Sequence, residues 1–173
     1  PGSGGAQFSF SDTGNIVYVA GGSGNQKLSV YWMDSQGKLT PLRETLGDYR
    51  NPAFSPDGKR LALDINDGKR RDVWVYEWER DTLTRLTFAG DSNGYPVWTP
   101  DGQRIVYNSQ EKGGALNLWW IRADGAGNAQ RLAESKSSQY GNSWRPDGKV
   151  LAFRHQNNGS GTNADIVTLT IEG

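Results

Sequence analysis

The fold is decided by the stretch Phe54-Ser55-Pro56-Asp57-Gly58-Lys59-Arg60-Leu61-Ala62-Leu63, which returns three more times in altered form. The other copies begin at Phe10, Trp98 and Trp144, and the copy at Phe10 lacks the proline. Their turn glycines lie 44, 44 and 46 residues apart, at Gly14, Gly58, Gly102 and Gly148. A period of this length is typical of β-propeller blades, which bury their faces against one another.

The Pro-Asp-Gly core of these stretches makes a tight turn for reasons of local chemistry. Proline fixes φ, aspartate accepts hydrogen bonds from neighbouring amides, and glycine accepts positive φ. We therefore expect a hairpin between the first two strands of each unit, with the ring before the turn, such as Trp98, packed between blades. Turn chemistry accounts for Asp57, Asp101 and Asp147, so these aspartates are not expected to bind a metal ion.

Each unit predicts short antiparallel strands, because apolar and aromatic residues come in brief runs between turn signals. Runs such as Val73-Trp74-Val75-Tyr76 are apolar at consecutive positions, which requires cover on both faces of the sheet. The strands are expected at 7–11, 16–20, 28–33 and 39–43; at 53–54, 60–65, 72–78 and 84–87; at 97–98, 104–109, 117–122 and 130–132; and at 143–144, 150–154 and 165–171.

The predicted fold class is all-β: a β-propeller of four-stranded antiparallel blades, with about four blades, the last of which lacks its outermost strand. The uncovered strand Ile166-Val167-Thr168-Leu169-Thr170 is a template for pairing. We therefore expect self-association, in which two copies contribute four blades each to an eight-bladed ring; closure of one chain on itself is the alternative. Residues 1–5 are interpreted as a linker or tag, and the expected blades span about 6–46, 47–90, 91–136 and 137–173.

Composition argues against several classes of partner and chemistry. Nineteen basic residues balance 19 acidic ones, so no net field is expected to attract nucleic acid or an anionic membrane. No apolar run approaches the roughly 20 residues needed to span a bilayer. The chain has no cysteine, which removes disulfides and thiolate metal sites. It also has no phosphate-binding glycine loop with lysine, hydrolase elbow or zinc-protease motif, so no cofactor and no catalytic residue is predicted.

The repeat resembles the TolB-like, WD-like β-propeller family, in which an aromatic-Ser-Pro-Asp-Gly turn is followed by an apolar strand and then by Asp/Asn-Ile/Leu-Trp. The second half of this signature is carried by Asp72-Val73-Trp74, Asn117-Leu118-Trp119 and Asp165-Ile166-Val167. More narrowly, the stretches 83–87 and 95–102 are similar to the C-terminal propeller of some bacterial serine/threonine kinases. The family resemblance favours a periplasmic or extracellular location.

The candidate ligand-binding residues are Tyr49, Arg50, Tyr95, Tyr140 and Asn142. They fall in the segments before the inner strands, where loops meet at one end of a propeller channel. A tyrosine offers a flat apolar face with a polar tip, which suits a peptide or a sugar. Packing between blades is the alternative interpretation of the three tyrosines.

Four other features are interpreted as structural or are rejected as sites. The basic run Lys69-Arg70-Arg71 is expected to form a solvated loop face. His155 has no carboxylate, cysteine or serine at an instructive spacing and is expected at the surface. Asn158-Gly159-Ser160 matches a glycosylation acceptor, which a bacterial-looking chain does not normally use. The segment 64–68 falls one residue short of the calcium-loop spacing.

The sequence therefore predicts a noncatalytic binding or scaffolding module that holds a protein or peptide partner at the channel-mouth loops. The alternative is an accessory sensor or gating domain of a larger enzyme, either a serine/threonine kinase or a prolyl-oligopeptidase-like hydrolase. A carbohydrate-processing enzyme on the same fold would need a cluster of histidines or carboxylates, and the chain has a single histidine.

Overall fold

The computed structural model describes residues 7–10, 16–19, 28–156 and 164–171, and within these ranges it contains strands and turns but no helix. No segment of the described chain forms a helix long and apolar enough to cross a membrane. The strands are β1 (Gln7–Phe10), β2 (Ile16–Val19), β3 (Leu28–Met33), β4 (Leu39–Phe54), β5 (Arg60–Asn66), β6 (Arg71–Glu77), β7 (Thr82–Arg85), β8 (Ser92–Trp98), β9 (Arg104–Gln110), β10 (Leu116–Arg122), β11 (Gln130–Ala133), β12 (Ser138–Trp144), β13 (Val150–Gln156) and β14 (Ala164–Thr170).

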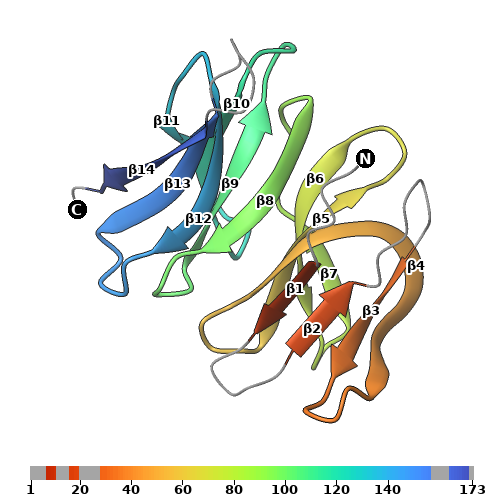
Figure 1. The fold of residues 1–173 in the computed structure, drawn as a ribbon. Coiled ribbons are helices and arrows are strands. Elements are labelled where there is room, and N and C mark those ends of the chain that lie inside the picture. The colour runs from red at the N-terminus through yellow and green to blue at the C-terminus, as the bar shows by residue number, and fades with distance from the viewer. Residues whose placement is uncertain (1–6, 11–15, 20–27, 157–163, 172–173) are drawn as a thin grey trace.

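Antiparallel pairing divides the strands into four groups, which we call blades 1 to 4. Blade 1 contains β1, β2, β3 and the first part of β4, and blade 2 contains the rest of β4 with β5, β6 and β7. Blade 3 contains β8 to β11, and blade 4 contains β12, β13 and β14. The blades follow one another in chain order (Figure 1).

Strand β4 corrects the sequence-based division between the first two units. Separate strands were expected at 39–43 and 53–54, but the backbone stays extended from Leu39 to Phe54. Its first part, up to Gly47, pairs with β3, and its second part, from Asp48, pairs with β5. Gly47 makes this passage possible, because a Cβ there would lie 2.7 Å from the ring of Tyr49. One strand thus ends blade 1 and begins blade 2.

The three described copies of the repeated turn have the predicted chemistry. In the first of them the Ser55 amide donates to the Arg60 carbonyl at 2.9 Å, and Gly58 has a φ of 65°. The turn aspartate accepts the amide of the residue two positions on in each copy, at 3.1, 3.0 and 2.9 Å for Asp57, Asp101 and Asp147. The turn of the first unit, residues 11–15, lies outside the described residues.

The hydrophobic core lies between successive blades, in three clusters. Strand β5 shows the principle: Leu61 and Leu63 pack toward blade 1, while Ala62 packs toward blade 3. In β9, Ile105 belongs to the cluster between blades 2 and 3, and Val106 to the cluster between blades 3 and 4. Both faces of the central sheets are therefore covered by neighbouring sheets, as the consecutive apolar runs predicted.

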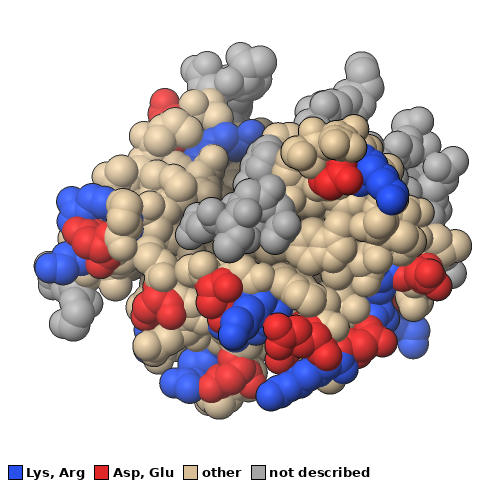
Figure 2. All heavy atoms as spheres, turned by 90° about the horizontal axis from the view of Figure 1, so that it is seen from below, with Lys and Arg blue, Asp and Glu red and all other residues tan. Residues whose placement is uncertain are grey.

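Acidic and basic side chains form pairs at the surface of the described chain. On the face shown in Figure 2, basic and acidic groups lie next to one another around the edge. Several are exposed pairs within one turn, such as Arg122 with Asp124 and Arg145 with Asp147. Such surface pairs contribute little to stability, because solvent screens the charges.

Candidate functional site at the channel mouth

The inner strands of the four blades face a common cavity of about 460 Å³. Its lining includes Ser9 from β1, Pro52 from β4, Pro96 from β8 and Asn142 from β12. By the repeat period, the last three of these residues occupy the same position in successive units. These lining residues therefore form the wall of the propeller channel. The volume of the cavity falls within the range of small-ligand sites.

Bulges reshape the inner strands near the end of the channel where these strands begin. The pairing register slips by one residue in β4, β8 and β12. The bulges in β4 and β8 place Asn51 and Tyr95 in the left-handed region, with φ values of 49° and 55°. Asparagine tolerates this region, whereas an aromatic residue rarely adopts it, at a cost of about 1–3 kcal/mol. Tyr95 is thus held in a strained conformation.

The three candidate tyrosines occupy three different positions of the repeat. The strand pairings make Asn93 and Gln139 the counterparts of Tyr49, and all three side chains are buried. Tyr49 is 3% exposed, and its hydroxyl donates a 2.9 Å hydrogen bond to the Thr45 carbonyl. Its ring therefore belongs to the packing between blades 1 and 2.

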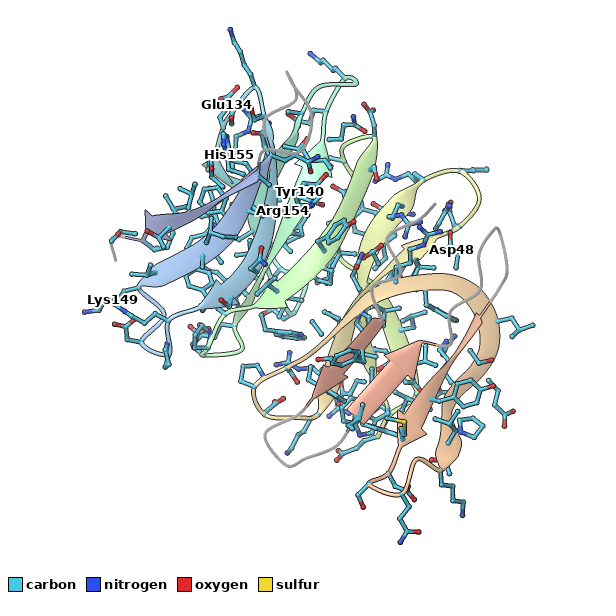
Figure 3. The ribbon with its side chains drawn as sticks, viewed as in Figure 1. Asp48, Glu134, Tyr140, Lys149, Arg154 and His155 are labelled. Carbon is cyan, nitrogen blue, oxygen red and sulfur yellow. The ribbon has the colours of Figure 1, made fainter. Side chains whose placement is uncertain are left out.

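Tyr95, Tyr140 and Arg154 form a stack at the mouth. The rings of Tyr95 and Tyr140 meet edge to face, with centroids 5.1 Å apart and planes at 78°. The guanidinium carbon of Arg154 lies 4.5 Å from the centroid of the Tyr140 ring. Tyr95 is 43% exposed, and Figure 3 shows Tyr140 and Arg154 together on the neighbouring strands β12 and β13. The stack joins blades 3 and 4 and presents aromatic surface to solvent.

Asp64 supports this stack from blade 2. Its side chain is fully buried and accepts hydrogen bonds from Asn51 Nδ2 at 2.8 Å, Arg71 Nη1 at 2.6 Å and the Tyr95 amide at 3.3 Å. Burial raises the pKa of the Asp64 carboxyl, against the opposing effect of the bonds from Arg71 and Asn51. A side chain at Gly94 would crowd the same carboxylate, at 3.3 Å.

The remaining candidates, Arg50 and Asn142, come from the inner strands of blades 2 and 4. Arg50 is exposed on β4 and its Nε donates to Asp48 Oδ1 at 2.9 Å. Asp48 lies across from Tyr140 in Figure 3. Asn142 is exposed on β12, two residues after Tyr140, and lines the channel cavity. Asp48 also pairs with Arg71, whose other partner Asp64 accepts the Tyr95 amide, so Arg50 is linked to the stack through this charged network.

Sequence reasoning missed Arg154. The pairings of the second strands make it the counterpart of Asp64 and Asn108, whose side chains both bond to the main chain of the next inner strand. An alignment of the units on their turns, carried through to the end of the second strand, would have exposed this position.

The basic run was wrongly interpreted as a solvated loop face. Arg70 donates to Asp72 Oδ2 from Nε at 2.7 Å and to Oδ1 from Nη2 at 2.8 Å, and Asp72 is 2% exposed. Arg71 begins β6 and binds Asp64. These arginines therefore neutralise buried carboxylates between strands, which a sequence window of three residues could not reveal.

His155 has a serine neighbour that its sequence spacing concealed. Its Nε2 lies 2.9 Å from Ser135 Oγ, in the connection after β11. Ser135 Oγ also accepts the amide of Ser137 at 3.0 Å, so the hydroxyl is part of a local turn. Among the described residues, no group of three or more histidine or carboxylate side chains could hold a metal ion. The glycosylation-like segment at Asn158 lies outside the described residues.

The fold and the four-stranded repeat define the chain as a β-propeller protein. A family model described as the TolB beta propeller domain matches residues 6–172, so the chain belongs to that family. The Tol-Pal system protein TolB of Anaeromyxobacter dehalogenans is 33% identical over 129 residues, which are 75% of this chain and 29% of that protein. An uncharacterized peptidase of Bacillus subtilis, YuxL, is 28% identical over 107 residues, 58% of this chain and 16% of that protein.

The fold is also similar to that of solved TolB structures. A putative TolB from Agrobacterium tumefaciens superposes with a TM-score of 0.83 at 20% identity, over 95% of this chain and 61% of that one. The chain therefore spans less than a third of the two curated relatives named above and under two thirds of this structural neighbour.

Proposed function

We propose that the chain is a noncatalytic binding module that holds a segment of a protein partner at the channel mouth formed by β8, β12 and β13. The observation that carries the proposal is Tyr95, which is 43% exposed although its backbone is held at a φ of 55° by a bond to a buried carboxylate. Backbone strain of this kind gathers at binding sites, where the surrounding structure fixes it.

The chemistry of the mouth suits a peptide. Tyr95 and Tyr140 give a rigid aromatic surface with two hydroxyl groups, and Asn142 adds an adaptable amide at the edge of the cavity. Tyrosine loses little side-chain entropy on binding because it has only two rotatable side-chain bonds, so it is efficient in recognition surfaces. The TolB relative is named as a protein of the Tol-Pal system, which supports a protein partner for this chain.

The test is a displayed library of random peptides selected against the chain. Selected peptides are synthesised and titrated into the wild type, Tyr140→Ala and the control Phe88→Ala. The control removes an exposed ring that follows β7 and is not part of the proposed site. We expect amide shifts in β8 and β12 and a loss of about tenfold in affinity for Tyr140→Ala alone. Peptides that bind Tyr140→Ala as tightly as the wild type would overturn the proposal.

A second part of the proposal is self-association through β14. Ile166 is 71% exposed, whereas Val73 and Leu118, its counterparts by strand pairing, are both 0% exposed because the next blade covers them. A blade from a second copy would cover Ile166 in the same way and supply pairing for an apolar edge strand. Two copies would then form an eight-bladed ring.

This part is tested by light scattering across a concentration series. We expect the wild type to have a mass of two chains at micromolar concentration. For Ile166→Lys, the protein concentration at which half of the chains are associated should rise by about tenfold or more, because a charge would enter the buried face. Leu46→Lys is the control, since Leu46 is 59% exposed on β4. The mass of a single chain at all concentrations would contradict self-association.

The alternative function is an accessory sensor or gate in a larger enzyme. The likeness to part of the peptidase YuxL is compatible with a hydrolase gate. In that case the ligand at the mouth is a peptide substrate on its way to another domain. Tyr140→Ala in a longer parent chain would then change substrate selection by the enzyme, and unchanged selection would exclude the gate.

A further inference from the structure

The boundary between blades 2 and 3 is closed by an arginine at the end where the repeated turns lie. The guanidinium carbon of Arg60 is 4.7 Å from the centroid of the Trp98 ring, and its Nη2 donates a 3.2 Å hydrogen bond to the Gly102 carbonyl. Trp98 is itself fixed, because its indole N–H donates to the Ala53 carbonyl at 2.9 Å. This boundary thus shows how the fold accommodates a guanidinium group.

The equivalent boundary between blades 3 and 4 is open. By the repeat, Arg104, Trp144 and Gly148 are the counterparts of Arg60, Trp98 and Gly102. Arg104 instead stacks within its own blade, 4.1 Å from the centroid of Trp120. A groove of about 480 Å³ remains, lined among others by Arg104, Trp120, Trp144 and Gly148. The buried indole N–H of Trp144 has no acceptor among the described residues.

Trp120 explains this difference between the two boundaries. The strand pairings make Val75 its counterpart in blade 2. Valine offers no aromatic face, so Arg60 reaches across to the next blade. Trp120 offers such a face, and Arg104 stacks on it within blade 3. The space around the turn glycines agrees with this difference. A Cβ at Gly102 would lie 3.5 Å from Pro56 and 3.7 Å from the Arg60 guanidinium, whereas a Cβ at Gly148 would lie 3.9 Å from Pro100 and would meet no guanidinium within 4 Å.

We propose that the groove between blades 3 and 4 binds an arginine side chain of a partner protein. The incoming guanidinium takes the place that Arg60 takes one blade earlier, flat against Trp144 and donating to the Gly148 carbonyl. This site is separate from the channel mouth and does not depend on the function proposed there.

Charges of both signs surround the groove, so the shape of an incoming cation matters more than its net charge. Asp101 and Asp147 line it and favour a cation, while Arg104 is present at its Trp120 side and Arg145 already pairs with Asp147 at 2.7 Å. A planar guanidinium can stack and donate in a fork at once. The compact ammonium of lysine can lie over a ring and donate hydrogen bonds, but it has no plane to stack and no fork of donors, so the site prefers arginine to lysine.

The probes are N-acetyl-arginine methylamide and its lysine analogue, titrated into the whole chain by NMR. We expect the arginine probe to shift the Trp144 indole signal with a Kd of about 1 mM, since cation–π stacking is modest at exposed sites. The Kd of the lysine probe should be at least about fivefold higher than that of the arginine probe. Equal binding of the two probes, or shifts confined to the channel mouth, would overturn the proposal.

Two variants use the repeat as an internal control. Trp120→Val copies blade 2, so Arg104 is released onto Trp144 and the arginine probe should no longer bind. Arg60→Ala opens the boundary at Trp98, and the probe should then bind two sites per chain instead of one. A probe that binds Trp120→Val as tightly as the wild type, or a stoichiometry unchanged by Arg60→Ala, contradicts the proposed role of these residues.

Discussion

The carboxylate of Asp64 on β5 accepts the main-chain N–H of Tyr95 on β8 at 3.3 Å and so joins blade 2 to blade 3 at the channel mouth. The same carboxylate is held by Arg71 and Asn51, so its direction is fixed by three donors. The left-handed conformation of Tyr95 is therefore maintained by a buried group and exists before any ligand arrives. A ring fixed in advance costs less entropy to bind than a mobile one.

Removal of the Asp64 side chain should be strongly destabilising. Asp64→Ala leaves Arg71, Asn51 and the Tyr95 amide without their shared acceptor, and we expect a loss of about 3 kcal/mol in the free energy of unfolding. Urea denaturation measures it. Asp124→Ala is the control, because that carboxylate pairs with Arg122 on the exposed surface. Equal effects of the two substitutions would show that the buried network contributes nothing special.

Tyr95 should be replaceable without loss of stability. Tyr95→Asn introduces the residue that stands at the same bulge position in β4, where Asn51 has a φ of 49°. Relief of strain offsets the lost contact with Tyr140, which is worth about 0.5–1.5 kcal/mol, so the free energy of unfolding should change by less than about 1 kcal/mol. Peptide binding at the mouth should fall in the same variant. A large drop in stability would mean that the ring is structural.

Trp98 should be among the costliest side chains to truncate. It is 6% exposed, stacks with Arg60 and donates to the Ala53 carbonyl, so Trp98→Ala should cost about 3–5 kcal/mol. Phe88→Ala removes a ring that is 68% exposed and should cost under about 0.5 kcal/mol. Thermal unfolding of both variants decides the matter. A small cost at Trp98 would contradict the packing of this ring between blades.

The sequence predicted the parts of the fold that depend on short-range chemistry. The turn at Asp57 and the two-sided burial of Val73 follow from neighbours in the chain, and both were anticipated. Strand β4 was divided wrongly, because nothing local distinguishes an extended connection from a loop. Gly47 permits the continuous strand only through the ring of Tyr49, a contact that the sequence does not display.

The candidate site was predictable only in part, because the burial of each tyrosine depends on its neighbours across strands. Tyr49, Tyr95 and Tyr140 lie nine, seven and eight residues before the turn glycines Gly58, Gly102 and Gly148. Tyr49 is buried, whereas Tyr95 and Tyr140 meet at the mouth. Arg154 and Ser135 reach their partners from other strands or connections, over separations that no local motif spans. Contacts between side chains of different strands and blades therefore could not be predicted from the sequence.

The turn aspartate Asp101 should make stability depend on pH in the acid range. A hydrogen bond from the Thr99 hydroxyl, with a second from the Gln103 amide, lowers the pKa of the Asp101 carboxyl in the folded chain. Because the folded pKa lies below the unfolded value of about 3.9, this contribution is present above that pH and is lost as the pH falls through the folded pKa.

The measurement is the difference in unfolding free energy between the wild type and Asp101→Asn as a function of pH. We expect the advantage of the wild type to be constant above about pH 5 and to shrink below about pH 4. Thr99→Val removes the main donor and should move the Asp101 titration back toward its ordinary pKa in an NMR experiment. A difference that grows as the pH falls would reverse the sign and show that the turn favours the protonated acid.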